Sequence, residues 1–239
     1  HNEAPRAPPL WTHLPGPAGE ARAAIFLDLA TQAIYRSEGT EALALTEEAH
    51  EIYKSLGAKA STVEVANVIT GISYALKELN RVDEATKTLD KAIDILKEGS
   101  YPFVVDSIRT KAKWLYDEKR CEEAIQSYLE VIQINEINGE NEFVGRDLLA
   151  ITLCYIRMGQ WSEAIEHGSR ARQYLKIAKC VEEVSWCDAL TADAYAELGN
   201  TDFALDIAQR AFDVAELKDW LLVKCQAALA QGKAYLLRD

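Results

Sequence analysis

Two stretches of the chain, residues 155–171 (YIRMGQWSEAIEHGSRA) and 195–211 (YAELGNTDFALDIAQRA), carry one pattern forty residues apart. Each places Tyr, Gly, Ala and Ala at the same spacings. The glycine is a helix breaker between two runs of helix-forming residues. The two alanines that follow it are seven residues apart, so they share one face of a helix, where small side chains let a neighbouring helix approach closely. The pattern predicts a helical hairpin that repeats.

Small residues recur at the same three positions through most of the chain. The second helix of each predicted hairpin begins with an alanine, at Ala42, Ala85, Ala124, Ala164 and Ala204, which gives spacings of 43, 39, 40 and 40 residues. Seven residues later come Ala49, Ala92, Val131, Ala171 and Ala211, and twelve residues earlier come Ala30, Ser73, Ala112, Thr152 and Ala192. These positions are the predicted contact points between the two helices of each hairpin.

The pattern resembles the tetratricopeptide repeat, in which Tyr, Gly and Ala occur in that order at those spacings. The resemblance covers roughly residues 23–239 and implies an all-α fold, a right-handed superhelical solenoid of five hairpins plus a terminal helix from Cys225 to Leu237. The sequence departs from the family in its period near forty, against about 34 in the family, and in lacking the closing proline. This long form is similar to the repeats of bacterial regulatory tetratricopeptide proteins.

Charge and cysteine content narrow the class of protein. With 38 Asp and Glu against 26 Lys and Arg, the net charge of -12 disfavours direct binding to nucleic acid or to anionic membranes. No apolar run approaches the roughly 20 residues that a transmembrane helix needs. The five cysteines are odd in number and include no CxxC pair, so we expect reduced thiols, a cytoplasmic location and no metal site.

The first twenty residues differ from the rest in composition. Residues 1–20 hold five of the six prolines and predict an arm or linker, whereas residues 21–239 predict the solenoid domain. Within the arm, Leu10 and Trp11 either dock on the folded body or form the hydrophobic contact of a recognition motif; we favour docking.

Three helix starts are also predicted. Ser61 and Glu64 have the spacing of a capping box, Asp219 precedes an apolar run as a cap, and Pro102 opens the third hairpin.

The resemblance places the first helices of successive hairpins on a concave face, so residues two, five, nine and twelve of each form one stripe. This stripe holds four cations beside tyrosines and an asparagine, a set that suits an extended peptide with a carboxylate. The predicted binding residues are Asn67, Thr70, Tyr74, Lys77, Arg109, Lys113, Tyr116, Arg146, Leu149, Leu153, Trp186 and Asp193. Alternatively, these cations are solvated groups that balance Asp106, Asp117 and other neighbours. The carboxylate clamp of chaperone-binding repeats is not matched.

No motif for catalysis occurs: the sequence has no HExxH, no phosphate-binding glycine loop and no nucleophile elbow. We therefore predict a non-catalytic protein- or peptide-binding scaffold that uses no cofactor and no metal. One alternative is a peptide-sensing domain of a bacterial regulator. Another is a self-associating module, a homodimer through the terminal helix, because Leu229, Leu236 and Leu237 are incompletely covered.

Overall fold

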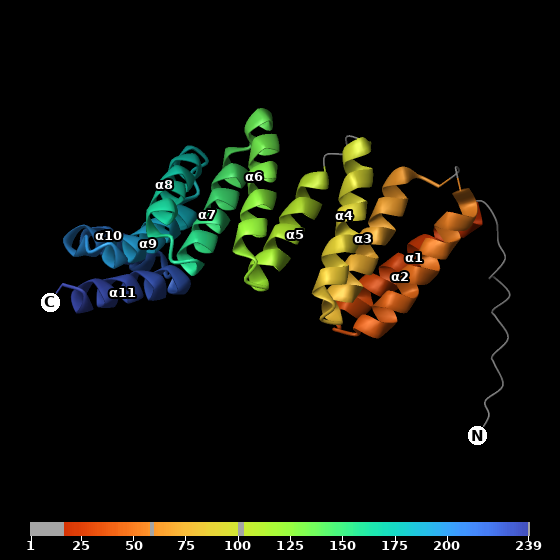
Figure 1. Ribbon diagram of the computed structural model, residues 1–239, viewed down its shortest axis with the longest axis horizontal. Helices are drawn as coiled ribbons and strands as arrows, with labels where there is room; N and C mark the ends of the chain where they lie inside the picture. The colour runs from red at the N-terminus through yellow and green to blue at the C-terminus, as the bar shows by residue number, and fades with distance from the viewer. Residues whose placement is uncertain (1–16, 58–59, 100–102, 239) are drawn as a thin grey trace, which may run out of the picture. The chain divides into compact units, whose positions relative to one another are not determined.

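The computed structural model describes residues 17–57, 60–99 and 103–238, and within them it contains eleven α-helices and no strand. The described residues fall into two compact units, unit 1 up to Ser107 and unit 2 from Ile108 onward. The boundary lies inside α5 (Val104–Asp117), and the helices of both units are labelled in Figure 1. Among the described helices, none has the length and apolar character needed to cross a membrane.

Unit 1 contains two helical hairpins. They are formed by α1 (Pro17–Tyr35) with α2 (Gly39–Leu56) and by α3 (Thr62–Glu78) with α4 (Val82–Glu98). Helix α3 packs on α2 and also touches α1, so the second hairpin stacks on the first. One group of buried apolar residues here is Ala23, Phe26, Ala49, Tyr53 and Val68.

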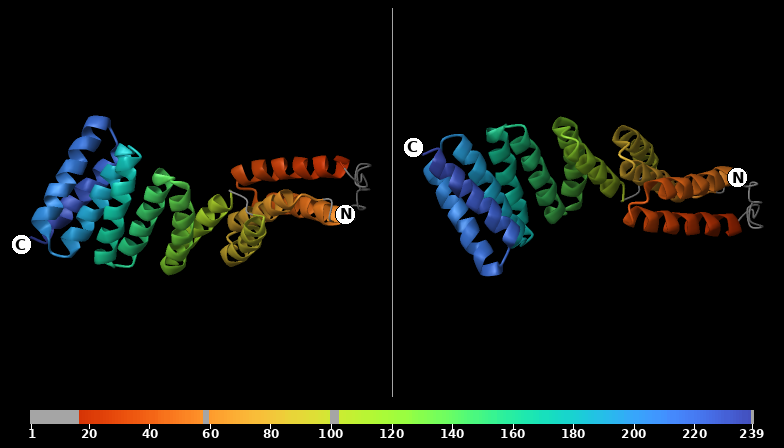
Figure 2. Two further views of the ribbon diagram at one scale, coloured as in Figure 1. Left: turned by 90° about the horizontal axis from the view of Figure 1, so that it is seen from above. Right: turned by 90° about the horizontal axis from the view of Figure 1, so that it is seen from below.

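Unit 2 continues the pattern from Ile108 of α5 onward. Its further helices are α6 (Cys121–Asn138), α7 (Asn141–Arg157), α8 (Trp161–Ile177), α9 (Val181–Glu197), α10 (Thr201–Lys218) and α11 (Leu221–Leu236). From α6 to α11 each helix packs on the next, and α9 also packs on α11 (Figure 2). Within this unit the stacked hairpins share a core that runs from Ala112 to Cys187.

The predicted contact positions are confirmed. All fifteen small residues of the repeat pattern are buried, none of them more than 2% exposed. Close approach of the helices is most severe at Gly145, where an added Cβ would lie 2.5 Å from Leu175 Cγ and 3.2 Å from the Leu175 backbone nitrogen. Helices α7 and α8 therefore pack at a distance that only glycine permits at this position.

The turns of unit 2 share one geometry. A residue in the left-handed region recurs at every twentieth position, at Lys119, Gly139, Gly159, Lys179, Gly199 and Asp219. The residue after each one donates its N–H to the carbonyl five residues back at 2.9 Å, as Arg120 does to Leu115. This is the Schellman motif, which satisfies the last carbonyls of a helix. Each helix plus its turn is thus 20 residues long, and two of them give the forty-residue period.

Helix starts differ from the sequence prediction at both ends of the chain. Helix α1 begins at Pro17, inside the predicted arm, because proline fits the first helical position, where no N–H donor is needed. The terminal helix α11 begins at Leu221, four residues before the predicted Cys225.

The predicted caps also need correction. Asp219 ends α10 in the left-handed conformation and does not cap α11, whose N-cap residue is Trp220. Ser61 lies at the N-cap of α3 as predicted, but its side chain makes no capping hydrogen bond. Leu10, Trp11 and Pro102 lie outside the described residues.

Candidate functional site

A hollow of about 400 Å³ lies between the first helices of unit 1, α1 and α3. We call it the α1/α3 hollow; it is lined by Leu27, Ala30, Thr31, Ile34, Tyr35, Thr46, Asn67, Thr70, Gly71 and Tyr74. None of these residues is charged, and the volume is in the range of ligand pockets. Three of the predicted binding residues, Asn67, Thr70 and Tyr74, belong to it.

The floor of the α1/α3 hollow is apolar although it contains threonine. The hydroxyl of Thr46 donates to the carbonyl of Ala42 at 2.9 Å within its own helix. Its methyl group lies 3.0 Å from where a Cβ at Gly71 would be, so the methyl and not the hydroxyl faces α3. At the rim Tyr35 and Tyr74 are exposed, and so is the amide of Asn67. The hollow therefore offers an apolar floor beneath a polar rim.

In unit 2 the corresponding helices are joined by ion pairs. Arg109 of α5 binds Asp147 of α7 through two hydrogen bonds, Nε to Oδ1 at 2.8 Å and Nη2 to Oδ2 at 3.1 Å. Asn135 donates to the same carboxylate at 3.3 Å. Asp147 is only 2% exposed, so these partners replace its lost hydration.

The next pair along joins α7 to α9. Arg146 Nη2 lies 2.8 Å from Glu183 of α9 and 2.9 Å from Glu142 of its own helix. The hydrogen bond to Glu183 raises the pKa of Arg146.

The third pair joins α9 to α11, where Lys233 Nζ lies 2.6 Å from Asp193 and 2.9 Å from Glu197. Burial acts to lower the pKa of Lys233, but the bonds to the two carboxylates outweigh it and raise the pKa. We call the three contacts Arg109–Asp147, Arg146–Glu183 and Lys233–Asp193 the ion-pair ladder. It ties α5, α7, α9 and α11 together through their own charges.

Tyr116 adds a contact between α5 and α7. Its carbonyl accepts a hydrogen bond from Arg157 Nη1 at 2.5 Å, and the same guanidinium stacks 3.8 Å above its ring. Of the other predicted residues, Lys77 is half-buried on α3 and Lys113 is exposed on α5, while Leu149, Leu153 and Trp186 are half-buried in unit 2. Because the predicted set spans both units, its grouping into one binding groove stays a prediction.

Sequence reasoning missed several residues of both sites. Asp147 and Glu183 are 38 and 37 residues from their arginine partners, close to one repeat, so a search for opposite charges one repeat apart would have found them. Leu27, Thr31 and Ile34 occupy the same stripe positions in the first hairpin as the predicted residues occupy in the second. Extending the stripe to that hairpin would have identified one wall of the hollow.

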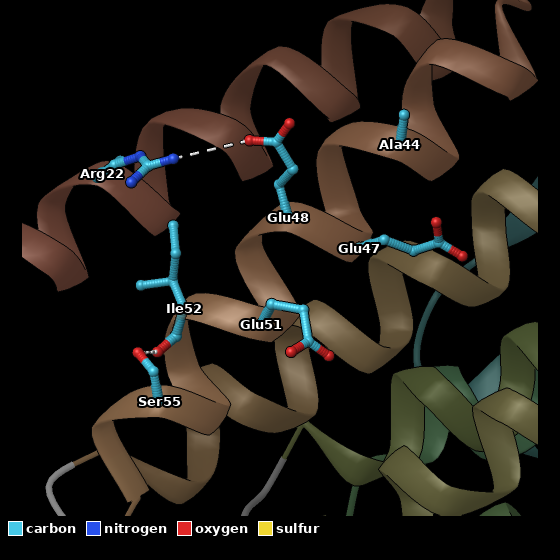
Figure 3. A pocket seen from close by; sticks show the side chains of 7 residues that line it. All are labelled: Arg22, Ala44, Glu47, Glu48, Glu51, Ile52 and Ser55. Carbon is cyan, nitrogen blue, oxygen red and sulfur yellow. Dashed lines mark hydrogen bonds and ion pairs between the residues drawn. The ribbon is translucent and has the colours of Figure 1, made fainter. Parts of the chain in front are cut away.

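A second, open hollow in unit 1 has the opposite character. It measures about 570 Å³ and is lined by Arg22, Ala44, Glu47, Glu48, Glu51, Ile52 and Ser55. Figure 3 shows Arg22 of α1 directed at Glu48 of α2, with Nη2 and Oε2 3.8 Å apart. Three glutamates from one helix make this surface acidic.

Two buried cysteines of unit 2, Cys154 and Cys187, are protonated packing residues. Burial raises the pKa of Cys154 and of Cys187 to about 12 in each case, with the neighbouring Cys121 adding to the shift at Cys154. Cys121 is buried in the first turn of α6, and Arg120 beside it binds Glu123 at 2.6 Å. Within the described ranges no group of three or more His, Cys, Asp or Glu side chains is placed to hold a metal ion.

Comparison with known proteins identifies the fold. No protein-family model and no curated protein matches the sequence. Solved structures do match, among them TPR-like repeats from Podosopora anserina, with a TM-score of 0.69 and 17% identity over 87% of this chain and 99% of that one.

Two further structures have the same fold. The apo form of RapI gives a TM-score of 0.73 at 16% identity, over 85% of this chain and 55% of RapI. Aspartyl phosphate phosphatase F from Bacillus subtilis gives 0.62 at 18% identity, over 92% of this chain and 60% of the phosphatase. The chain therefore has the fold of a tetratricopeptide-like solenoid, and the predicted all-α class is confirmed.

Proposed function

We propose that this chain is a non-catalytic protein- or peptide-binding module, and that an apolar side chain of the partner binds in the α1/α3 hollow. The observation that carries the proposal is the uncharged cavity of about 400 Å³ on the first-helix face of unit 1. Concave surfaces of stacked helical repeats are suited to extended ligands.

The energetics favour an apolar anchor. Burying one Leu or Phe side chain of a partner contributes about 2 kcal/mol. The walls of the hollow stand on helices, so little ordering is needed on this side of the complex. At the rim, Asn67 supplies an amide that both donates and accepts hydrogen bonds, which matches a peptide backbone.

An acidic partner at the predicted cationic stripe is less favoured. Arg109 and Arg146 already bind carboxylates of the chain itself, so an acidic ligand there has to displace Asp147 or Glu183. Displacing the buried Asp147 would leave a carboxylate without its partner, at a cost of several kcal/mol. The peptide-sensing alternative stays a prediction from the sequence.

A peptide selection tests the proposal. Peptides enriched on the full chain from a random displayed library are measured for affinity by fluorescence anisotropy. Thr31→Trp fills the hollow from an exposed position, and the neighbouring Gln32→Trp, which is exposed and does not line the hollow, is the matched control. We expect the peptides to share an aliphatic or aromatic residue and to bind Thr31→Trp at least about tenfold more weakly, which corresponds to roughly 1.4 kcal/mol. Equal binding to all three proteins would exclude the hollow as the site.

A further inference from the structure

An uncharged segment of the chain precedes helix α1. Residues 7–16 (APPLWTHLPG), which we call the Trp11 segment, contain no Asp, Glu, Lys or Arg, and their large apolar residues are Leu10, Trp11 and Leu14. The segment lies outside the described residues, but its length and its point of attachment follow from the sequence and from the start of α1 at Pro17. Burying a tryptophan side chain removes roughly 150–250 Å² from water, so we expect Trp11 to be covered.

The surface of α1 provides a path from Pro17 to the α1/α3 hollow. Ala21 and Ala24 are exposed and lie on one helix face with Leu27 and Thr31, which both line the hollow. At a rise of about 1.5 Å per residue, Leu27 lies about 15 Å and Thr31 about 21 Å along the helix axis from Pro17. The small alanine side chains leave room for a chain that runs along this face toward the hollow.

The Trp11 segment is long enough to bring Trp11 to the hollow. Proline-rich sequence favours the polyproline II conformation, which rises about 3.1 Å per residue. Trp11 is six residues before Pro17, so it can reach a point about 19 Å from the start of α1. This point is between the levels of Leu27 and Thr31.

The residues between Trp11 and α1 suit the same path. Leu14 is three residues from Trp11, which is one turn of polyproline II, so the two side chains lie on the same side of an extended segment. Leu14 is then about 9 Å from the start of α1, at the level of Ala24. Gly16 stands between two prolines, and Pro-Gly and Gly-Pro pairs are typical of turns, so the chain can reverse its direction there.

We propose that Trp11 occupies the α1/α3 hollow and has to leave it before the side chain of a partner can bind. This rests on the proposed function of the hollow and adds a regulation by the chain itself. The hollow measures about 400 Å³, has no charged residue in its lining and can accommodate one indole ring. At its rim, the amide oxygen of Asn67 can accept a hydrogen bond from the indole N–H, which usually has a partner when tryptophan is buried.

Charge and tethering favour the Trp11 segment as the occupant. An uncharged segment can enter an uncharged hollow without losing the hydration of any ionised group. Attachment to α1 through six residues keeps the effective concentration of Trp11 near the hollow on the order of millimolar, so a weak contact is sufficient. A partner then competes with a side chain that is always nearby, and its apparent affinity falls in proportion to the fraction of hollows that are empty.

Fluorine NMR of the full chain labelled with 5-fluorotryptophan tests the contact. The resonance of Trp11 is identified by its loss in Trp11→Phe, and a labelled peptide of residues 7–16 gives its frequency outside the hollow. We expect a different frequency in the native protein and a return to the peptide frequency in Thr31→Glu, which puts a charge at the hollow. The neighbouring Gln32→Glu adds the same charge at a residue that does not line the hollow and should leave the resonance unchanged. A native Trp11 resonance at the peptide frequency, or one that Thr31→Glu does not move, overturns the proposal.

Peptide affinity tests the regulation. The displayed library is selected on the native chain and on Trp11→Ala, and the affinity of the enriched peptides for both proteins is measured by fluorescence anisotropy. We expect them to bind Trp11→Ala at least about threefold more tightly, because no tryptophan then competes for the hollow. The matched control His13→Ala changes the same segment and should bind the peptides as the native chain does.

The two measurements separate this proposal from the proposed function. Enriched peptides that bind the native chain and Trp11→Ala equally overturn the regulation and leave the proposed function intact. If neither protein enriches a peptide, the proposed function fails and the regulation fails with it, whereas the Trp11 resonance still decides whether Trp11 occupies the hollow. Circular dichroism verifies that each variant is folded.

Discussion

The two units use the same helix positions for opposite purposes. In unit 1, residue five of the first helix is Leu27 in α1 and Thr70 in α3. Between these two helices lies the α1/α3 hollow. In unit 2 the same position of α5 holds Arg109, which binds Asp147 of the next first helix. One repeat register thus produces either a cavity that can take a ligand or a face closed by its own charges. The side chains on the stripe decide between these two outcomes, because the buried small residues at the helix contacts occupy the same repeat positions in both units.

Removing the most buried carboxylate of the ion-pair ladder, Asp147, should have the largest effect. Asp147→Ala leaves Arg109 half-buried without this partner and Asn135 without its acceptor, so we expect unit 2 to lose about 3 kcal/mol. Asn67→Ala at the exposed rim in unit 1 should change stability by less than about 0.5 kcal/mol. Urea unfolding followed by tryptophan fluorescence in a Trp11→Phe background reads unit 2, which holds Trp114, Trp161, Trp186 and Trp220. Circular dichroism in the same titration reads the helices of both units and measures Asn67→Ala. Similar losses of unfolding free energy from Asp147→Ala and Asn67→Ala would contradict the view that only unit 2 depends on its stripe charges.

A pair of glycines compares the packing of the units directly. Gly145→Ala in unit 2 forces a Cβ to 2.5 Å from Leu175 Cγ and should destabilise that unit by about 2 kcal/mol. Gly71→Ala borders the α1/α3 hollow, where the Cβ would lie 3.0 Å from the Thr46 methyl. The gain in helix propensity there, about 1 kcal/mol, offsets the crowding and leaves a change near zero. Thermal unfolding followed by circular dichroism measures both; an unstable Gly71→Ala would mean that unit 1 is as tightly packed as unit 2.

Alkaline pH should weaken unit 2 before unit 1. The thiols of Cys154 and Cys187 keep their protons up to a pKa of about 12 in the folded state, whereas the unfolded chain loses them near pH 9. Their contribution is complete below the unfolded pKa and falls as pH rises from about 9 toward 12, reaching a loss of about 1 kcal/mol already at pH 9. Unit 1 has no cysteine. Urea midpoints at pH 7 and pH 9 measure the loss, and Cys154→Ala with Cys187→Ala should abolish it.

The exposed contact of the ladder should matter least. Arg146 is half exposed, so Arg146→Ala is expected to cost unit 2 only about 0.5 kcal/mol at low salt. High sodium chloride should remove most of that difference, since exposed charges are screened. A salt-independent cost would show that the side chain acts through packing. Double-variant analysis with Glu183→Ala measures the coupling directly.

The sequence predicted features that depend on residues close together in the chain, and it missed features that depend on residues about one repeat apart. The alanines at positions such as Ala42 and Ala164 predicted the hairpins correctly, because close helix contact requires small side chains at fixed spacing. The ladder was not predicted, since Arg109 has other acids near it in sequence and only the stacking of hairpins selects Asp147. The hollow depends on the shape left between Leu27, Ile34 and Tyr74, which no spacing rule contains.

The turns of unit 2 have the same geometry, so one hairpin of forty residues is the length by which this unit can be shortened or extended. The left-handed residue recurs at every twentieth position from Lys119 to Asp219. If the forty residues between two alternate turns are removed, the first of these turns is joined directly to the helix that follows the second. Removing or duplicating residues 160–199, for instance, keeps every remaining helix in phase with its neighbours. Genetic insertion and deletion in steps of one hairpin can thus lengthen or shorten this protein without requiring any new fold.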